Sequence, residues 1–214
     1  MGNSVLNIVI CGVGGQGTVL AGKLLAACAL AEGAFVRSAE TIGMAQRGGS
    51  VLGHVRISPS EGDGSLASPL VPKGQAQLLI GFEPLETLRA YPFCVPDALV
   101  VTATDPLSPP TASLQKLSYD GTAQLAALQK EAAEGRIATL VLIDNDSIMA
   151  ELGFDRALNV VLLGAALAVL ESSSYEAPWL GLEAMQCAIE KTVKKQFVEP
   201  NLRALEIGWK YRNP

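Results

Sequence analysis

The fold is decided by residues 5–17, Val-Leu-Asn-Ile-Val-Ile-Cys-Gly-Val-Gly-Gly-Gln-Gly. The apolar run Val5–Cys11 is typical of a buried parallel strand that is apolar on both faces. A helix-prone segment rich in Ala and Leu follows over Thr18–Glu32. The glycines between them have the spacing G-x-G-x-x-G: Gly12, Gly14 and Gly17. The stretch therefore predicts a strand that turns tightly into a helix, and exposed N–H groups at the start of that helix favour an anion.

Outward from this unit, apolar runs alternate with helix-prone segments. Gly33 is placed to end the first helix, a strand at 35–39 would complete a β-α-β unit, and Glu40–Gly49 is expected to be a loop. Further strands are expected at 50–58, 76–82, 98–103 and 138–143, and helices at 84–91, 121–134, 155–170, 180–191 and 200–211. The pattern predicts a doubly wound, Rossmann-like α/β fold with a mostly parallel sheet and a helical C-terminal third, about 145–214. We expect residues 1–214 to form a single domain.

Composition narrows the choice of partners. The net charge is −5 with 16 Lys and Arg, and no basic stripe is visible, so nucleic acid is not expected. The longest strongly apolar run, Val160–Leu170, is about half a membrane span, and the N-terminus has no basic segment ahead of an apolar core. We therefore expect a cytoplasmic protein with no membrane partner. Apolar residues make up 49% of the chain, which favours a large subunit interface in addition to a buried sheet.

Two cofactor signatures are incomplete in this chain. The four cysteines are scattered without any C-x-x-C pair, so no zinc or iron–sulfur cluster is expected in this chain alone, and buried free thiols are expected instead. Gly62-Asp63-Gly64 resembles the start of a thiamine diphosphate motif. That motif needs an Asn further on, but none occurs between Gly64 and Asn145, so the segment is interpreted as a turn.

The glycine motif by itself has two interpretations. A dinucleotide fingerprint needs an acidic residue about 20 positions further on, at the end of the second strand, and Glu40 is at roughly that distance. Close packing of a helix on a strand needs the same glycines. Nucleotide binding and a structural or interface role therefore both remain open for this turn.

A second unusual segment runs from Glu40 to Ser50 and contains Gln46, Arg47 and three glycines. A guanidinium beside Gly48 and Gly49 suits a carboxylate or a phosphate, because it is a planar, bidentate donor next to exposed backbone. The alternative is a surface loop closed by an Arg–Glu ion pair, which contributes little. The only histidine, His54, follows on an alternating strand. It is either a proton shuttle or interface group, or a structural, hydrogen-bonded residue, and no nucleophile is placed near it by spacing.

The two segments in this order resemble a known family, the gamma domain of the 2-oxoacid:ferredoxin oxidoreductases. The resemblance is carried by Gly-Val-Gly-Gly-Gln-Gly at 12–17, by Glu40 with Gly43, by Gln-Arg-Gly-Gly at 46–49, by Ser-Val at 50–51 and by His-Val-Arg at 54–56. Asn159 with Leu163-Gly164, and Asn201 with Gly208, are similar to the family's C-terminal helices. A free-standing chain of this length is most similar to the beta subunit of indolepyruvate:ferredoxin oxidoreductases.

The resemblance implies a subunit of a complex that oxidatively decarboxylates a 2-oxoacid, with indolepyruvate or another aryl pyruvate expected, to an acyl-CoA and reduces ferredoxin. Thiamine diphosphate, Mg²⁺ and the [4Fe–4S] clusters are expected in a large partner subunit, with CoA as co-substrate and ferredoxin as acceptor. On this view the chain is not catalytic alone, holds no metal, helps to assemble the complex and forms a wall of the substrate and CoA cleft.

The resemblance also selects the residues expected to face the partner or the cleft. They are Gly12, Gly14, Gly15, Gln16, Gly17, Glu40, Gln46, Arg47, Gly48, Gly49, Ser50 and His54. Two alternatives stay open. One is a free NAD(P)-binding Rossmann oxidoreductase, suggested by the glycine spacing, and the other is a stand-alone module that binds CoA or another small molecule without a redox role.

Overall fold

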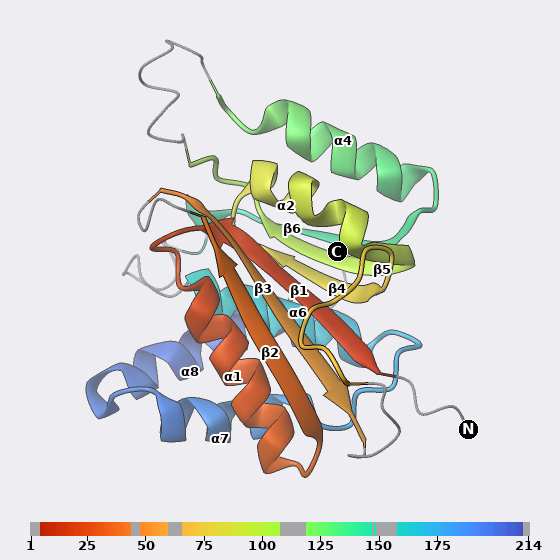
Figure 1. Ribbon diagram of the computed structural model, residues 1–214. Coiled ribbons are helices and arrows are strands. Elements are labelled where there is room, and N and C mark those ends of the chain that lie inside the picture. The colour runs from red at the N-terminus through yellow and green to blue at the C-terminus, as the bar shows by residue number, and fades with distance from the viewer. Residues whose placement is uncertain are drawn as a thin grey trace.

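The computed structural model describes residues 5–43, 48–59, 66–107, 119–146, 148 and 158–211. Its centre is a six-stranded sheet with the strand order β2-β3-β1-β4-β5-β6 and helices on both faces (Figure 1). The strands are β1 Leu6–Val13, β2 Phe35–Ile42, β3 Ser50–Ser58, β4 Ala76–Gly81, β5 Cys94–Ala103 and β6 Ile137–Ile143. The helices are α1 Thr18–Ala31, α2 Pro84–Ala90, the 3₁₀ turn η1 Tyr91–Phe93, α4 Thr122–Ala133, α6 Leu158–Glu171, α7 Leu182–Thr192 and α8 Lys195–Trp209.

The predicted α/β class and the mostly parallel sheet are confirmed. Strands β1, β4, β5 and β6 pair in parallel, whereas β3 is antiparallel to both of its neighbours, β1 and β2. The unit β1-α1-β2 is present, but its two strands do not pair with each other because β3 lies between them. This inserted strand distinguishes the sheet from one in which the second strand is the direct neighbour of the first.

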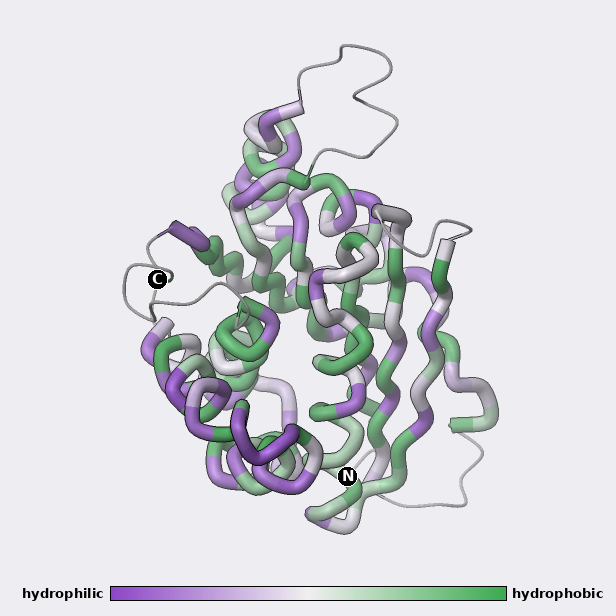
Figure 2. Tube along the Cα trace, turned by 90° about the vertical axis from the view of Figure 1, so that its left-hand side faces the viewer, coloured by the Kyte–Doolittle hydropathy of each residue, from purple (hydrophilic) through white to green (hydrophobic). Residues whose placement is uncertain are grey.

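The two faces of the sheet carry separate apolar cores. On one face, side chains such as Ile8, Ile10 and Leu78 pack against α1 and α6, with α7 and α8 completing this larger cluster. On the other face, the side chains of Val9 and Leu79 pack under α2 and α4. In Figure 2 the sheet is largely hydrophobic along its trace, while the outer helices carry more of the hydrophilic segments. The alternation of faces along β1 is the expected period of two.

Helix α6 is the most deeply buried element. All residues from Asn159 to Leu170 are buried, which confirms the expected helix apolar on every side within the described residues. It crosses α8 at two glycines: a Cβ at Gly164 would overlap the Leu205 carbonyl oxygen, and a Cβ at Gly208 would overlap that of Val161. Because neither glycine has a side chain, the two helix backbones touch directly at this crossing. None of the helices in the described ranges is both long and apolar enough to cross a bilayer.

Three predicted boundaries are wrong. The strand expected at 98–103 is β5, and it begins at Cys94. Glu40 was expected in a loop, but β2 continues through it to Ile42, because the long antiparallel ladder with β3 pairs Ile42 with Val51. Helix α8 was expected to begin at Pro200, but it begins at Lys195 and includes that proline. Gly33, in contrast, has the left-handed φ of +81° that was expected at the end of α1.

The cysteines are free, as expected, but their burial differs. Cys11 and Cys28 are buried, whereas Cys94 and Cys187 are only partly covered, so the expectation of four buried thiols is wrong for two of them. Burial nevertheless raises the pKa of Cys94 to about 12, so that this thiol stays protonated at neutral pH.

Candidate functional site

The glycine motif and the end of the second segment lie side by side. The Gly14 N–H donates to the Gly49 carbonyl oxygen at 2.8 Å, and the Gly48 N–H donates to the Gly14 carbonyl oxygen at 3.4 Å. The turn after β1 is therefore joined by its backbone to the residues just before β3. Gln46 and Arg47, two of the predicted site residues, lie outside the described residues.

Gln16 holds the turn in shape through its side chain. Its Oε1 accepts a hydrogen bond from the Val13 N–H at 2.7 Å, and its Nε2 donates to the Phe82 carbonyl oxygen at 2.8 Å. These contacts connect the ends of β1 and β4. The amide is therefore engaged with backbone, and its role in the described structure is to fix the turn.

The glycines of the motif are needed for different reasons. A Cβ at Gly12 would come within 2.8 Å of both the Gln16 Oε1 and the Phe82 Cβ, so there is no room for a side chain. Gly15 and Gly17 have φ values of +110° and +89°, which L-residues with side chains rarely adopt. Gly17 is also the residue before α1, and a Cβ there would lie 2.7 Å from the Asn159 Nδ2. The sequence G-x-G-x-x-G thus meets the steric needs of a tight strand-to-helix turn.

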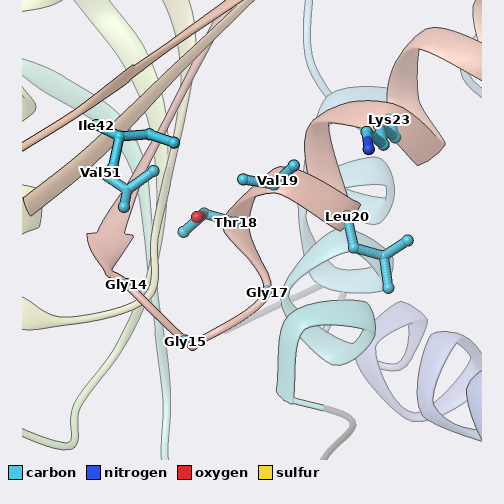
Figure 3. Close-up of a pocket in the computed structure, with 9 residues that line it drawn as sticks. All are labelled: Gly14, Gly15, Gly17, Thr18, Val19, Leu20, Lys23, Ile42 and Val51. Carbon is cyan, nitrogen blue, oxygen red and sulfur yellow. The ribbon is translucent and has the colours of Figure 1, made fainter. Parts of the chain in front are cut away.

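An open cavity of about 430 Å³ lies between this turn, the first two turns of α1 and the ends of β2 and β3 (Figure 3). Its wall is mostly apolar, with a single charged side chain, and it is lined by Gly14, Gly15, Gly17, Thr18, Val19, Leu20, Lys23, Ile42 and Val51. A smaller hollow adjoins it along β2 and is lined in part by Ser38 and Glu40. Glu40 is exposed, and its register opposite Gly53 places it on the α1 side of the sheet.

Ser50 connects the cavity rim to α2. Its hydroxyl donates to the Glu86 carboxylate at 2.5 Å, and the Arg89 guanidinium contacts the other oxygen of that carboxylate at 2.7 Å. Beneath this contact Glu83 is 1% exposed; it accepts hydrogen bonds from the Glu86 N–H at 2.9 Å and from the Tyr119 hydroxyl. Burial and the neighbouring carboxylate raise the pKa of the Tyr119 phenol, so it remains a donor.

His54 does not join this group. Its ring lies on the opposite face of the sheet, where it packs edge-on against Phe93 with the ring centroids 5.6 Å apart. Its Nδ1 accepts a hydrogen bond from the Val71 N–H at 3.3 Å, and burial lowers the pKa of the imidazole. Of the two interpretations of His54, the structure favours the structural, hydrogen-bonded one.

Sequence reasoning missed the side chains that give the cavity its character. The sequence pattern predicts Val19, Leu20 and Lys23 only as part of a helix rich in Ala and Leu, and Ile42 as part of a loop. One signal was available: Thr18–Ala31 is apolar on all sides except for Lys23. A helix of that kind is normally covered on every side, yet Leu30 in its last turn is 56% exposed. Ile42, which ends β2 beside the first turns of the helix, is 53% exposed.

The described residues can be compared with what a metal or iron–sulfur site needs, and with what a dinucleotide site needs. No group of three or more His, Cys, Asp or Glu side chains within the described ranges is placed to hold a metal ion. The cysteines lie on four different elements, β1, α1, β5 and α7, which does not fit the four-thiolate site of an iron–sulfur cluster. For a dinucleotide, the acid at the end of the second strand is expected one strand away from the glycine turn. Here β3 intervenes, so Glu40 is about 10 Å across the sheet from β1.

The chain is similar in sequence to known proteins. The chain is 37% identical over 206 residues to a protein of Archaeoglobus fulgidus named indolepyruvate oxidoreductase subunit IorB, covering 95% of this chain and 94% of that one. It is 33% identical over 204 residues to the protein of the same name from Pyrococcus horikoshii, with the same two coverages.

Two solved structures have a similar fold. One is the gamma subunit of a keto/oxoacid ferredoxin oxidoreductase from Geobacter sulfurreducens, with a TM-score of 0.63 and 20% identity over 97% of this chain and 98% of that one. The other is a pyruvate oxidoreductase subunit from Thermotoga maritima, with a TM-score of 0.66 and 19% identity over 96% of each chain. The family model described as pyruvate ferredoxin/flavodoxin oxidoreductase matches residues 7–211. The chain therefore belongs to the pyruvate ferredoxin/flavodoxin oxidoreductase family, as a subunit of an oxidoreductase.

Proposed function

We propose that this chain is the smaller subunit of an indolepyruvate, or other aryl pyruvate, ferredoxin oxidoreductase, and that it is not catalytic alone. It assembles with a large subunit that carries thiamine diphosphate, Mg²⁺ and the [4Fe–4S] clusters, and it forms one wall of the cleft for the 2-oxoacid and CoA. The complex oxidatively decarboxylates the 2-oxoacid to an acyl-CoA and passes the electrons to ferredoxin. The names of the curated relatives support this choice of substrate.

The observation that carries the proposal is the apolar surface around the cavity. Ile42, which lines the cavity, is more than half exposed, and Lys23 is the only charged residue of α1. Leaving such a surface in water is unfavourable by roughly 25 cal/mol for each Å² of apolar area. Covering it with another subunit removes that cost, as in obligate interfaces that resemble a divided core.

This chain would contribute a rigid cavity wall that is held in a fixed position. The Gly14–Gly49 backbone contact, the Gln16 bridge and the Ser50–Glu86 hydrogen bond fix the cavity rim to β1, β4 and α2. A wall held in this way keeps its shape when substrate enters, so a bound 2-oxoacid or CoA loses less affinity to reorganisation of the site. The oxidation chemistry belongs to the cofactors held by the partner subunit.

Co-expression tests the proposal. The tagged chain is produced with a large protein from the same organism that contains a thiamine motif and two ferredoxin-like cysteine runs. Size-exclusion chromatography then measures the complex, and reduction of methyl viologen with CoA measures its activity toward indolepyruvate, phenylpyruvate, pyruvate and 2-oxoglutarate. The expected result is one stable complex that is most active with the aryl pyruvates. Failure to form a complex, or a complex without 2-oxoacid-dependent reduction, overturns the proposal.

A matched pair of variants locates the interface. Ile42→Asp places a charge beside the cavity and is expected to prevent assembly. Phe197→Asp changes a residue of similar exposure, 47%, on α8 and is expected to leave assembly intact. Circular dichroism of both free variants controls for folding. If the two variants assemble equally well, the interface does not lie at this cavity.

A further inference from the structure

Strand β2 forms one edge of the sheet, and its free side is long and regular. Among the described strands it pairs only with β3, and this ladder has no register shift along its 8 residues. The strand contains no proline, so each residue on the free side keeps both a donor and an acceptor. Figure 1 shows β2 as the outermost strand, with α1 alongside it. An edge of this kind is a template for pairing with another strand.

The ladder to β3 determines which backbone groups face outward. The Gly43 N–H donates to the Ser50 carbonyl oxygen, and bonded and non-bonded pairs alternate along an antiparallel ladder. The odd-numbered residues of β2 therefore bond to β3. The residues whose N–H and C=O groups point to the free side are Val36, Ser38, Glu40 and Ile42. None of the hydrogen bonds between described residues uses these outward groups.

A second copy of β2 fits this edge when a two-fold axis passes through Ala39. Directly opposite residues in an antiparallel pair are either both bonded or both non-bonded, so the axis between two copies must pass through one residue of the strand. With the axis at Ala39, Val36 lies opposite Ile42 of the second copy. Ser38 then lies opposite Glu40 of the second copy. All four outward residues of each copy exchange backbone hydrogen bonds in this register.

Other two-fold registers fit the edge less well. An axis at Ser38 puts Ile42 opposite Ala34 of the second copy. The Ala34 N–H already donates to the Ala29 carbonyl oxygen, so this pair cannot form fully. An axis at Glu40 puts two carboxylates directly opposite each other, which is destabilising. Axes nearer either end of the strand leave more of β2 unpaired.

The side chains that meet in the register centred on Ala39 are complementary. Directly opposite residues lie on one face of a sheet, and the outward residues of β2 all lie on the α1 side. Val36 and Ile42 form an apolar pair at each end. The Ser38 hydroxyl can donate to the carboxylate of Glu40 between them. Arg37, on the other face, lies opposite a threonine, so no like charges are directly opposed.

Helix α1 adds to this surface. Val19 and Lys23 line the cavity together with Ile42, so this side of the helix faces β2. Leu30 lies on the same side, about two turns beyond Lys23, and is 56% exposed. A short turn joins the end of α1 to the start of β2, which brings Leu30 near Val36. In a joined sheet, Leu30 and Val36 of one copy would meet Ile42 of the other.

We propose that β2 pairs with β2 of a second copy of this chain, in the register centred on Ala39, so that two six-stranded sheets become one continuous sheet. A stable interface buries about 800 Å² on each partner, so the flanking α1 helices contribute to it as well as the ladder. The inference goes beyond the proposed function, because it concerns contact between two small subunits and not contact with the large one.

Disulfide cross-linking of the full, purified chain tests the register. The two Ala39 residues face each other in a non-bonded pair, in which the Cα atoms are about 4.5 Å apart and a disulfide can form. Ala39→Cys is therefore expected to give a linked dimer on a non-reducing gel after mild oxidation. Arg37→Cys is the matched control. Its two copies are offset by about 13 Å along the strands, so linkage is expected to stay at the level of the native cysteines.

Charge substitutions at Ser38 test the same register by affinity. Because Glu40 of the second copy is opposite, Ser38→Lys creates two opposite-charge pairs in each dimer, and Ser38→Glu creates two like-charge pairs. Sedimentation equilibrium is expected to show a dimer Kd that falls about 2- to 30-fold with Ser38→Lys and rises by a similar factor with Ser38→Glu. Ser38 is exposed, and circular dichroism of both variants controls for folding.

Four results overturn the inference. They are a wild-type chain that stays monomeric at about 200 µM, equal linkage of Ala39→Cys and Arg37→Cys, Kd changes that are absent or of one sign for the two Ser38 variants, and linkage of Ala39→Cys to the large subunit in the co-expressed complex. Ile42 also lines the cavity, so these variants leave it unchanged. Assembly with the large subunit is measured separately by co-expression, and failure of the strand pairing is therefore distinguishable from failure of the proposed function.

Discussion

Substituting Gly164 with Ala tests how closely α6 and α8 must approach. A Cβ at this position would overlap the Leu205 carbonyl oxygen and lie 2.9 Å from the Trp209 N. Both atoms belong to the backbone of α8, so no side-chain rotation relieves the clash, and the helices must separate. Overpacking of this kind costs about 1–3 kcal/mol, and we take the upper value because backbone is involved. The better helix propensity of Ala returns about 1 kcal/mol, so the expected net loss is about 2 kcal/mol.

The same substitution at Gly22 is the matched control. A Cβ there would lie 3.6 Å from the Ile10 Cδ1, an ordinary van der Waals contact. Gly22→Ala should therefore keep the gain in helix propensity of about 1 kcal/mol without a clash. The two variants are expected to differ by about 3 kcal/mol, or about 6–12 °C in Tm for a chain of this size. Urea and thermal unfolding followed by circular dichroism measure both. Melting temperatures of Gly164→Ala and Gly22→Ala that agree within about 2 °C would refute the reasoning from backbone contact.

Three further predictions concern single side chains. Gln16→Glu loses the donor to the Phe82 carbonyl oxygen and places a carboxylate against it; thermal unfolding should show a loss of about 2 kcal/mol, and an unchanged Tm contradicts the bridging role. Burial lowers the pKa of His54 below its usual 6.5, so the unfolded chain takes up a proton that the folded chain does not, and stability falls as the pH drops below about 6.5. His54→Gln should flatten this fall in urea unfolding between about pH 7 and 5, and an unaltered slope rejects the assignment to His54. Tyr119→Phe removes the hydroxyl donor from the buried Glu83 carboxylate and should cost about 2 kcal/mol in urea unfolding, whereas a neutral effect means that another group satisfies that carboxylate.

Local signals in the sequence predicted the elements but not their neighbours. The apolar run of β1, the glycine turn and the left-handed Gly33 follow from steric rules that act within a few residues. The placement of β3 between β1 and β2 depends on which faces are buried together, and that is decided by contacts far apart in the sequence. The extension of β2 through Glu40 to Ile42 has the same origin, because its ladder to β3 outweighs a glycine-rich composition nearby.

The sequence predicted the glycine turn of the candidate site but not the side chains around the cavity, because only the turn is determined by neighbouring residues. The conformation of Gly15 and Gly17 is dictated by the turn, so the motif could be read directly from its spacing. The residues next to Lys23 in the sequence do not distinguish it from other helical lysines. It lines the cavity only because the fold places Ile42 opposite α1. His54 alternates correctly on β3, but its ring packs against Phe93 and its Nδ1 accepts from the Val71 N–H, and both residues lie far from it in the sequence.

The burial of α6 has a consequence during synthesis of the chain. This helix is the most apolar of the helices that the structure describes, and α8, which covers one side of it, emerges roughly 40 residues later. At about 5–20 residues per second, α6 waits some seconds on the ribosome with that side uncovered. Every newly made molecule thus passes through a stage in which this apolar helix lacks the cover of α8, so molecular chaperones and translation speed in this stretch affect how much protein is recovered.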